Sequence, residues 1–544
     1  MKEVLVIGSG IAGMSAAVNC AERGMHVCLV SPFPSERSQS VMAAGGINAV
    51  LADNDKGDSI ESHVEDTLAG GCRLGGRNAV TGLCTGAEKV IRQLEDFGTV
   101  FSREADGRIA RRAFGGQSHK RTCYGGASTG KQIVTALVME TRRYECMGLI
   151  ERRLRSDFHS GLIRDGRCYG ALIYNEAERK LEPVYSDAVI IATGGQNALF
   201  GKTTGSTTCD GYAAGRLFVQ GAVLKNLEFI QYHPTTIETP QKRMLISEAA
   251  RGEGGRLFYY ENDRRVYFME EKYGPNGNLM TRDTVSREIC SAGSQVWLDM
   301  SFLDRRIIDS RLPEVRDICM KYVGTDISRE PVAVAPSVHF FMGGLAVHND
   351  HETSIRNLYA AGECASIYHG ANRLGGNSLL AAVYGGSVAA VSIADSETER
   401  VNEDFSAYAA EENEKLTSGM KNDCSFSVMR MREQLADIMR RDLGVVRDGE
   451  SLQKGIRTID HYLSIAGSSG NDSSVHPYHN YSLTAMLILA RAALTCAGER
   501  RESRGAHFRS DYPEQNSAYD CPSLIRYEEG SYKVSYDREN AYES

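Results

Sequence analysis

Residues 2–31 constrain the fold more than any other part of the sequence. Residues 2–7 (KEVLVI) form a short apolar run of the kind found in buried parallel strands. A GxGxxG turn, a helical segment that ends near Gly24 and a second strand (HVCLVS) follow. Glycines in such a turn let the helix N-terminus approach a pyrophosphate. This pattern predicts a dinucleotide site with contacts at Gly8, Gly10, Ala12 and Gly13, whereas a strand-to-helix turn without a ligand is the alternative.

The end of the second strand bears on which dinucleotide is bound. Many dinucleotide sites place an acidic residue there to hold a ribose. This chain has Ser31, whose hydroxyl can still bond a ribose, but the missing acid weakens a nicotinamide interpretation and favours FAD at least equally. A later strand, residues 187–195 (DAVIIATGG), also favours FAD, because enzymes with two dinucleotide domains carry such a strand where the backbone approaches the cofactor. Its candidate contacts are Ala192, Thr193 and Gly194.

Bulk composition excludes several classes of protein. The 544-residue chain has a net charge of -8, which argues against nucleic acid as its partner. No run of 18 or more apolar residues predicts a membrane span, and the first residues enter a strand without a basic leader. The 14 cysteines form no CxxC pair, so we expect no metal site or iron–sulfur cluster in this chain. We expect a cytoplasmic protein.

Five further motifs carry a resemblance to one family. They are FIQYHPTTI (229–237), LISEAARGEGG (245–255), TRDTVSREI (281–289), SVHFFMGG (337–344) and HGANRLGGNSLL (369–380). In this order they closely resemble the flavoprotein subunits of fumarate reductase and succinate dehydrogenase, a family that also includes L-aspartate oxidase. The resemblance runs from residue 2 to about residue 513. It implies FAD as cofactor and hydride transfer between flavin N5 and a four-carbon dicarboxylate, with a proton exchanged at the neighbouring carbon.

The motif order implies an α/β fold in three parts. A Rossmann-like FAD-binding domain would comprise residues 1–237 and 344–404, with an α+β capping domain inserted at 238–343. The cap would close over the substrate at the domain interface. Residues 405–544 would form a C-terminal helical domain with a tail, because apolar residues recur there at helical spacing. The tail alternates apolar and polar residues (SLIRYEEGSYKVSYD), which predicts a late hairpin.

Arg282 in TRDTVSREI resembles the family's catalytic acid or base. Arginine is an unusual proton donor because its free pKa is above about 12, so it would need a relay that reprotonates it at once. Glu248 and Arg251, spaced i and i+3 in SEAARG, resemble that relay. An ordinary surface ion pair between Arg282 and Asp283 is the alternative.

Four residues resemble the family's substrate ligands. His233 and His339 would bind one carboxylate and Arg373 the other, since guanidinium groups match carboxylates well. Ser247 stands where family members usually have threonine and would keep the hydroxyl contact. A histidine taken alone is more often structural than a ligand, but here two occur in matching motifs.

The resemblance also assigns residues to the flavin. Glu363 in YAAGECAS resembles the acid that bonds the ribityl chain. Asn377, Ser378 and Leu379 lie where a Gly-rich segment leads into a helix near the expected isoalloxazine ring. Asp210 in CDGYAAG matches a family acid beside the flavin, with a helix N-cap as the rival explanation.

The segment RSQSVMAAGGIN (37–48) bears on how FAD is held. We expect Ser38 and Ala44 to contact the cofactor and the backbone of Gly45 and Gly46 to lie against the isoalloxazine ring, because glycine permits close approach. In membrane-bound relatives a histidine of the matching RSH stretch bonds covalently to the flavin. Gln39 cannot form that bond, so we expect non-covalent FAD. Covalent attachment generally raises a flavin's potential and helps it oxidise succinate, so its absence favours fumarate reduction.

Phe114 separates two substrate classes within the family. In aspartate oxidases the matching loop carries a glutamate before the Gly-Gly, which would receive the ammonium of aspartate. A phenyl ring cannot replace that charge partner, and losing a buried one costs several kcal/mol. Phe114 therefore favours a dicarboxylate without an amine, although it would be an ordinary core residue if the match slipped by one position. L-Aspartate oxidase, converting aspartate to iminoaspartate for NAD biosynthesis, remains the alternative activity.

Two further hypotheses lie outside this reaction: a flavin-binding structural subunit that is inactive without its complex, and a nicotinamide dehydrogenase. The chain has no cluster ligands of its own, so we expect electrons to arrive from an iron–sulfur partner subunit or a diffusible donor. Such a partner would hold the protein at the inner face of the membrane.

Overall fold

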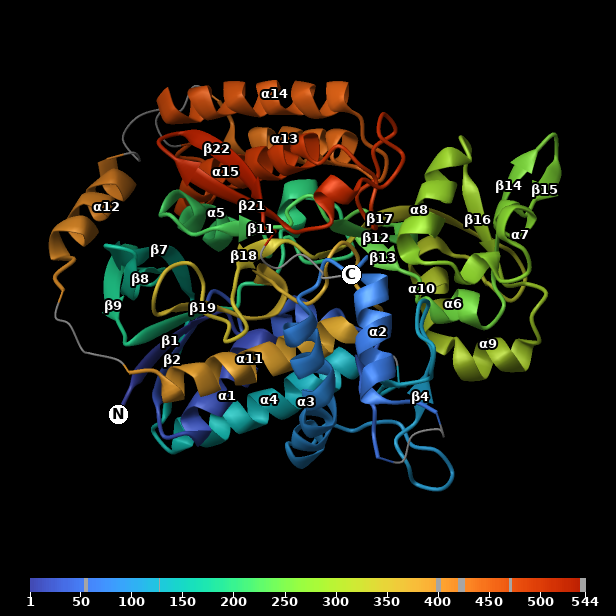
Figure 1. Ribbon diagram of the computed structural model, residues 1–544, viewed down its shortest axis with the longest axis horizontal. Helices are drawn as coiled ribbons and strands as arrows, with labels where there is room; N and C mark the ends of the chain where they lie inside the picture. Colours follow the sequence, from blue (N-terminus) through green and yellow to red (C-terminus); the bar gives the residue numbers. More distant parts are fainter. Residues whose placement is uncertain (53–56, 127, 398–402, 419–425, 469–471, 539–544) are drawn as a thin grey trace.

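A parallel sheet with the order β19-β10-β1-β2-β6 forms the centre of the molecule. The computed structural model describes residues 1–52, 57–126, 128–397, 403–418, 426–468 and 472–538. The strands are β1 (Glu3–Ile7), β2 (His26–Ser31), β6 (Ile150–Leu154), β10 (Ala188–Ile191) and β19 (Leu358–Ala360). Helices α1 (Ile11–Glu22), α4 (Thr129–Cys146) and α11 (Asn377–Asp395) lie together in the lower half of Figure 1, with α2 (Ile60–Gly70) and α3 (Arg77–Asp96) beside them. The predicted strand–turn–helix–strand start is confirmed.

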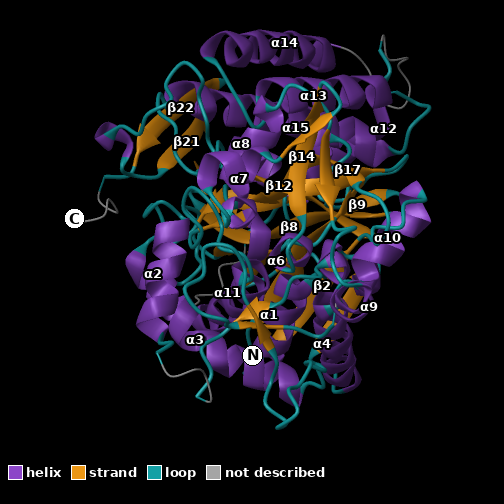
Figure 2. Cartoon of the chain, turned by 90° about the vertical axis from the view of Figure 1, so that its right-hand side faces the viewer, coloured by secondary structure: helices purple, strands orange, loops and turns teal. Residues whose placement is uncertain are grey.

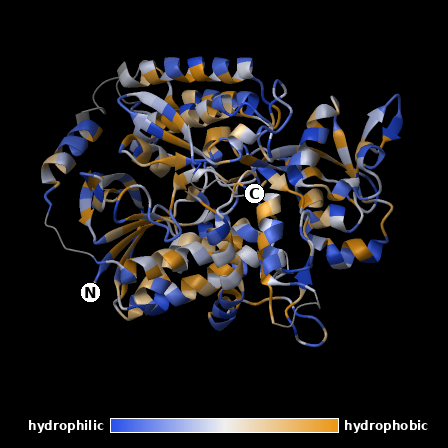
Figure 3. Ribbon diagram, in the orientation of Figure 1, coloured by the Kyte–Doolittle hydropathy of each residue, from blue (hydrophilic) through white to orange (hydrophobic). Residues whose placement is uncertain are grey.

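Smaller sheets surround this one. β7 (Ser156–Arg164), β8 (Arg167–Asn175) and β9 (Lys180–Tyr185) form an antiparallel sheet between β6 and β10 in the chain. Another small sheet contains β3 (Ile47–Asn48), β4 (Arg111–Arg112) and β5 (Thr122–Cys123). Figure 2 shows the strands in the interior with helices outside them, and Figure 3 shows hydrophobic residues along the central strands. The chain therefore has the α/β class expected from its sequence.

The cap has a hydrophobic core of its own, made from residues between Ile237 and Val334. Its sheet has the order β13-β12-β17-β16-β14-β15. The strands are β12 (Ile230–Glu238), β13 (Arg243–Leu245), β14 (Arg256–Glu261), β15 (Arg264–Val266), β16 (Val296–Asp299) and β17 (Val332–Phe341). Its helices are α6 (Ala249–Gly252), α7 (Phe268–Tyr273), α8 (Arg282–Ser291), α9 (Arg305–Arg311) and α10 (Pro313–Val323), at the right of Figure 1.

Strands β12 and β17 connect the two cores. Ile230 of β12 and Val338 of β17 belong to the main core, whereas Ile237 and Val334 belong to the core of the cap. The middle of each strand therefore lies at the junction. His233 lies between Ile230 and Ile237 on β12, whereas His339 lies near the end of β17, directly after Val338.

The C-terminal helices share the main core instead of forming a separate one. Residues of α13 (Val428–Asp442), α14 (Gly449–Ser468) and α15 (Pro477–Glu499) belong to it, while α12 (Ser406–Ser418) packs on β9. The tail forms the hairpin β21 (Ser523–Glu528) and β22 (Ser531–Tyr536), which pairs with β11 (Leu224–Lys225). By length and composition α11 and α15 could cross a membrane, but 56% and 72% of their apolar windows are buried inside the protein.

Candidate active site

A cavity of about 630 Å³ runs from the carboxyl ends of the parallel strands to the cap. Most residues singled out from the sequence line it. On the sheet side these are Gly8, Gly10, Ala12, Ser31, Ser38, Gln39, Ala44, Gly45, Gly46, Ala192, Thr193, Gly194, Asp210, Glu363, Ser378 and Leu379. On the cap side they are Phe114, His233, Ser247, Glu248, Arg282, His339 and Arg373. The structure places the other three, Gly13, Arg251 and Asn377, behind the cavity wall.

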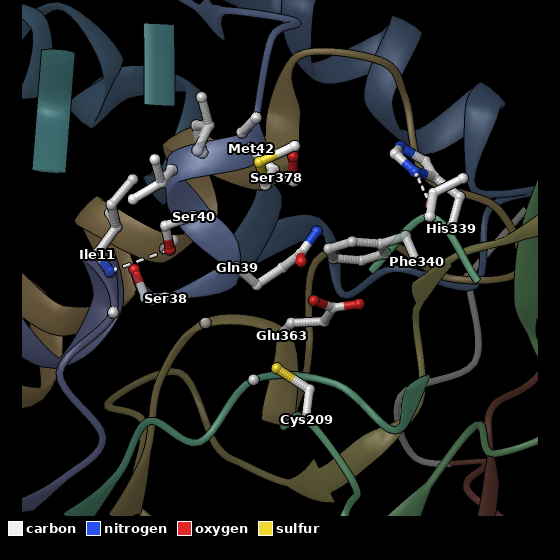
Figure 4. A pocket seen from close by; sticks show the side chains of 18 of the residues that line it. Ile11, Ser38, Gln39, Ser40, Met42, Cys209, His339, Phe340, Glu363 and Ser378 are labelled. Atoms are coloured by element: carbon white, nitrogen blue, oxygen red, sulfur yellow. Dashed lines mark hydrogen bonds between the residues drawn. The ribbon is translucent and has the colours of Figure 1, made fainter. Parts of the chain in front are cut away.

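The turn before α1 forms one end of the wall. A Cβ on Gly13 would lie 1.8 Å from the carbonyl oxygen of Gly8, so Gly13 serves the close fit of the helix on its own turn. The N–H of Ile11 donates a hydrogen bond to Ser40 Oγ (3.2 Å; Figure 4). The first turn of α1 therefore lines the cavity, and the Ile11–Ser40 hydrogen bond holds the segment 38–42 next to it.

Arg112 holds the loop that contains the glycine pair. Its guanidinium donates hydrogen bonds to the carbonyl oxygens of Ala44 (2.6 Å) and Gly45 (Nε, 3.0 Å). Gly46 has a φ of 126°, and a Cβ there would lie 2.6 Å from the carbonyl oxygen of Cys123. Gly46 is thus required by the neighbouring strand β5 as well as by its place in the cavity wall.

Gln39 projects into the cavity from the short 3-10 helix η2 (Gln39–Met42). Figure 4 shows its side chain directed toward Phe340 and Glu363. Glu363 receives a hydrogen bond from the N–H of Phe341 (3.1 Å). Burial raises the pKa of Glu363 to about 7. A buried carboxyl group with few hydrogen bonds to stabilise its charged form therefore lines the cavity beside Gln39.

Asp210 lies at the cavity wall and contacts the start of α5. It lines the cavity, and its Oδ1 accepts a hydrogen bond from the N–H of Tyr212 (3.0 Å) at the start of α5 (Tyr212–Val219). Its Oδ2 accepts a hydrogen bond from the hydroxyl of Tyr478 (2.7 Å), which lies on α15. The residue therefore orders a helix start and connects the cavity to the C-terminal segment.

Asn377 points away from the cavity. Its Oδ1 accepts hydrogen bonds from Asn48 Nδ2 (2.7 Å) and His63 Nε2 (3.0 Å), and its Nδ2 donates to Thr67 Oγ1 (2.9 Å). The Asn377 side chain therefore belongs to a buried network that fixes the start of α11. Ser378 and Leu379, the next two residues, do line the cavity.

Arg282 and Arg373 meet at one side chain that the sequence did not suggest. Arg282 Nη1 and Arg373 Nη2 donate hydrogen bonds to the same oxygen of Gln231, at 3.0 and 2.8 Å. Arg373 Nε is buried without a hydrogen-bond partner among the described residues. Burial and the neighbouring Arg282 lower the pKa of Arg373 to about 9. Two cationic groups therefore face the cap end of the cavity, one with an unused donor.

A chain of charged groups runs inward from Arg282. Its Nε donates a hydrogen bond to Glu248 Oε2 (2.9 Å), and Arg251 Nη2 lies 3.9 Å from Glu248 Oε1. Burial acts to raise the pKa of Glu248, but Arg282 and Arg251 bring it down to about 2. Arg251 is fully buried behind Glu248 and donates to the carbonyl oxygen of Asn278 (2.5 Å). Arg282 pairs with Glu248 rather than with Asp283.

His233 and His339 lie against each other, with ring centroids 5.3 Å apart in an edge-to-face arrangement. Burial and Arg282 hold the pKa of both imidazoles well below the usual range, so both are neutral at neutral pH. His339 Nδ1 is within hydrogen-bond distance of Thr204 Oγ1 (2.9 Å). Each ring is therefore an uncharged polar group at the cavity wall.

Phe114 lines the cavity next to Gly45 and Gly375. Its ring lies 3.6 Å from the position of a Cβ on Gly45, and its side chain approaches Gly375. The next residue, Gly115, donates its N–H to Glu248 Oε1 (3.0 Å). Ser247 lines the cavity beside Glu248, and its Oγ accepts a hydrogen bond from the N–H of Ala249 (3.3 Å).

Comparison with known proteins shows the family to which the chain belongs. Residues 3–379 match the family described as FAD binding domain, and residues 432–542 match the one described as fumarate reductase flavoprotein C-term. The chain belongs to the succinate dehydrogenase and fumarate reductase flavoprotein family. It is 39% identical to the succinate dehydrogenase flavoprotein subunit of Bacillus subtilis, over 94% of this chain and 92% of that protein.

Two further similar proteins are named as fumarate reductases. The fumarate reductase flavoprotein subunit of Mycobacterium tuberculosis is 33% identical over 98% of this chain and 96% of that protein. In the solved structures, E. coli quinol fumarate reductase matches with a TM-score of 0.88 and 28% identity over 98% of this chain and 96% of that chain. The protein is therefore an FAD-dependent oxidoreductase of this family.

The cavity of this flavoprotein fits FAD. The hydroxyl of Ser38 is buried without a hydrogen-bond partner among the described residues and lines the cavity near the start of α1. Helix N-termini of this kind hold pyrophosphate groups. Glu363 would accept hydrogen bonds from the ribityl hydroxyls. Residues from Gly8 to Ala12 and the segment 38–46 would surround the rest of the cofactor.

The flavoprotein site contains residues that sequence reasoning missed. Gln231 lies two positions before His233 on β12, and residues at that spacing face the same side of a strand. This spacing could have indicated that Gln231 lies on the same side of β12 as His233. Arg112, Thr204 and Tyr478 act through contacts with distant segments, which no local pattern reveals. His369, which begins the HGANR motif and is a sequence candidate for orienting that loop, lines the cavity as well, and burial and Arg373 lower its pKa to about 3.

Proposed function

We propose that this flavoprotein reduces fumarate to succinate, with Arg282 as the proton donor. The observation that carries the proposal is the position of Arg282, which faces the cavity while bonded to Glu248 behind it and to Gln231 beside it. A residue held in this way combines access to a substrate with a route for its own reprotonation.

The cap end suits a dianion with two separated carboxylates. The unused Nε of Arg373 would donate to one carboxylate. Neutral His233 and His339, with Ser247, would bind the other by hydrogen bonds. Because both imidazoles are uncharged, the attraction comes from the two guanidinium groups. Loss of water on closure of the cap would strengthen these contacts.

Proton delivery would follow the chain of charged groups. Bound FAD, when reduced, supplies a hydride from N5 to one alkene carbon. The Arg282 guanidinium would give a proton to the other carbon, and Glu248 would pass a replacement from Arg251. The ionised state of Glu248, with its pKa of about 2, keeps it ready to accept that proton. The hydrogen bond of 2.9 Å between Arg282 and Glu248 and the separation of 3.9 Å between Glu248 and Arg251 support this order.

The direction of the reaction rests on Gln39. A glutamine amide forms no covalent bond to flavin, so FAD would be held non-covalently and at a lower potential than in covalently linked relatives. A lower potential favours electron flow from flavin to fumarate. The proposal is supported by the position of Gln39, whose side chain extends into the cavity (Figure 4).

An electron-transfer partner completes the proposal. Two structural matches carry the names quinol fumarate reductase and quinol-fumarate reductase with menaquinol molecules. We infer that this chain receives electrons from a partner subunit containing iron–sulfur clusters. Assembly with such a subunit would place it at the inner face of the membrane.

An anaerobic assay with reduced viologen tests the proposal directly. Fumarate and aspartate are offered side by side to the purified protein. We expect viologen oxidation with fumarate and, under air, no hydrogen peroxide with aspartate, because Phe114 supplies no charge for an ammonium group. Peroxide from aspartate would identify an aspartate oxidase. Failure to reduce fumarate in a flavin-loaded sample would favour a structural subunit.

A further inference from the structure

Ser31 does not supply the acidic group that dinucleotide sites usually place at the end of the second strand. Its hydroxyl lies within the cavity wall, but its single hydrogen is donated to the carbonyl oxygen of Phe33 (2.7 Å). It also accepts a hydrogen bond from Ser9 Oγ (2.8 Å). At most one acceptor position of Ser31 remains for a ligand.

The neighbouring strand brings a carboxyl group to the same edge of the sheet. β6 pairs in parallel with β2, and Leu154 lies opposite Ser31. The chain then turns at Arg155, which has a φ of 55°, and starts β7 at Ser156. Ser156 and Asp157 therefore follow directly at the carboxyl edge, and both line the cavity.

The carboxyl group of Asp157 lacks the hydrogen bonds that stabilise the carboxyl group of nearby Asp210. Both oxygens of Asp210 accept hydrogen bonds, from Tyr212 and Tyr478. In the part of the chain that the structure describes, no group donates a hydrogen bond to the Asp157 carboxyl. Burial and the adjacent Asp210 raise the pKa of Asp157 to about 7. Asp157 is partly buried at the cavity wall, and a carboxyl group there without a donor is costly, so a ligand that supplies a donor is favoured here.

We propose that Asp157 binds the adenosine half of FAD by accepting a hydrogen bond from a ribose hydroxyl or from the adenine amino group. Asp157 follows β6, the strand next to β2, and would make the contact that an acidic residue at the end of β2 usually makes. The other end of FAD, where the substrate reacts, lies with Arg282 and the cap. The proposal therefore depends on FAD as cofactor but is independent of the direction of the reaction.

Binding of flavins to the full-length protein, depleted of FAD by dialysis, tests this assignment. The quenching of flavin fluorescence gives dissociation constants for FAD and for FMN, which lacks adenosine. We expect Asp157→Ala to weaken FAD binding about tenfold to a hundredfold, which matches one hydrogen bond to a charged group. FMN binding should stay unchanged. Asp157→Asn keeps an acceptor oxygen and should lose less affinity for FAD than Asp157→Ala.

Two comparisons sharpen the test. Flavin hypoxanthine dinucleotide lacks the adenine amino group: weaker binding than FAD to the unmodified protein assigns the contact to that amine, and equal binding assigns it to a ribose hydroxyl. Ser31→Ala should cost less FAD affinity than Asp157→Ala. The proposal is overturned if Asp157→Ala binds FAD normally, if it loses FAD and FMN equally, or if Ser31→Ala has the larger effect. Retained FMN binding shows that a variant is folded.

Discussion

Arg282 and Arg373 are joined through one amide oxygen, that of Gln231, at 3.0 and 2.8 Å. Two guanidinium groups repel each other, and a shared neutral acceptor is what allows both to face one small volume. The arrangement fixes the spacing of the proposed proton donor and the proposed carboxylate ligand. It also gives Gln231 a role that neither motif by itself suggested.

Gln231→Leu tests this shared acceptor. Leucine has a similar size but accepts no hydrogen bond, so both guanidinium groups lose their fixed positions. We expect kcat/KM for fumarate to fall about tenfold to a hundredfold, because hydrogen bonds to charged groups contribute about 1.5–3 kcal/mol. Bound FAD, measured by flavin absorbance per chain, should be unchanged. Unaltered kinetics would remove Gln231 from the site.

Attachment of the flavin is tested by acid precipitation. Gln39 offers no covalent link, so all yellow colour should appear in the supernatant when the protein is denatured with acid. Absorbance of supernatant and pellet gives the released fraction. Colour that remains in the washed pellet would show covalent FAD and would remove the argument from Gln39 to the direction of the reaction.

Stability should decrease in mild acid because of buried neutral histidines. Burial and Arg373 lower the pKa of His369 to about 3, whereas an unfolded histidine titrates near 6.5. Below pH 6.5 the unfolded chain binds more protons than the native one, so the free energy of unfolding falls as pH falls. From these two values His369 accounts for about 2 kcal/mol of loss at pH 5.

Urea unfolding at pH 7 and pH 5 measures this effect. In His369→Gln the loss of stability between these pH values should be smaller by about 2 kcal/mol than in the unmodified protein. His461→Gln is a suitable control, because His461 is exposed to solvent on α14. An identical pH dependence in all three proteins would contradict the account of His369.

Local patterns were sufficient for the first part of the fold. The strand–glycine–helix start depends on neighbours in sequence, and β1, α1 and β2 formed as expected. Helical spacing in residues 405–544 predicted helices, but it could not show which segments they pack against. The structure merges them with the main core and pairs β21 with β11.

The site shows the same limit. Motifs carried over from the family placed Arg282, Glu248 and His233 in one cavity. Asn377 was expected at the flavin, but three side chains from distant segments turn it inward. Similarly, the demand for glycine at Gly46 comes partly from Cys123 on another strand. These contacts join segments that are far apart in the sequence, so local sequence patterns could not reveal them.

The central claim is that Arg282 donates the proton. Its most direct test is the rate at which fumarate reoxidises the reduced flavin of Arg282→Ala in an anaerobic stopped-flow experiment. Arg287→Ala is the matched control, because Arg287 lies on the same helix and pairs with Asp283 outside the relay. We predict full FAD content in both variants, a normal rate in the control and a loss of at least about a hundredfold in Arg282→Ala. A rate in Arg282→Ala above a few per cent of that of the unmodified protein would contradict the account.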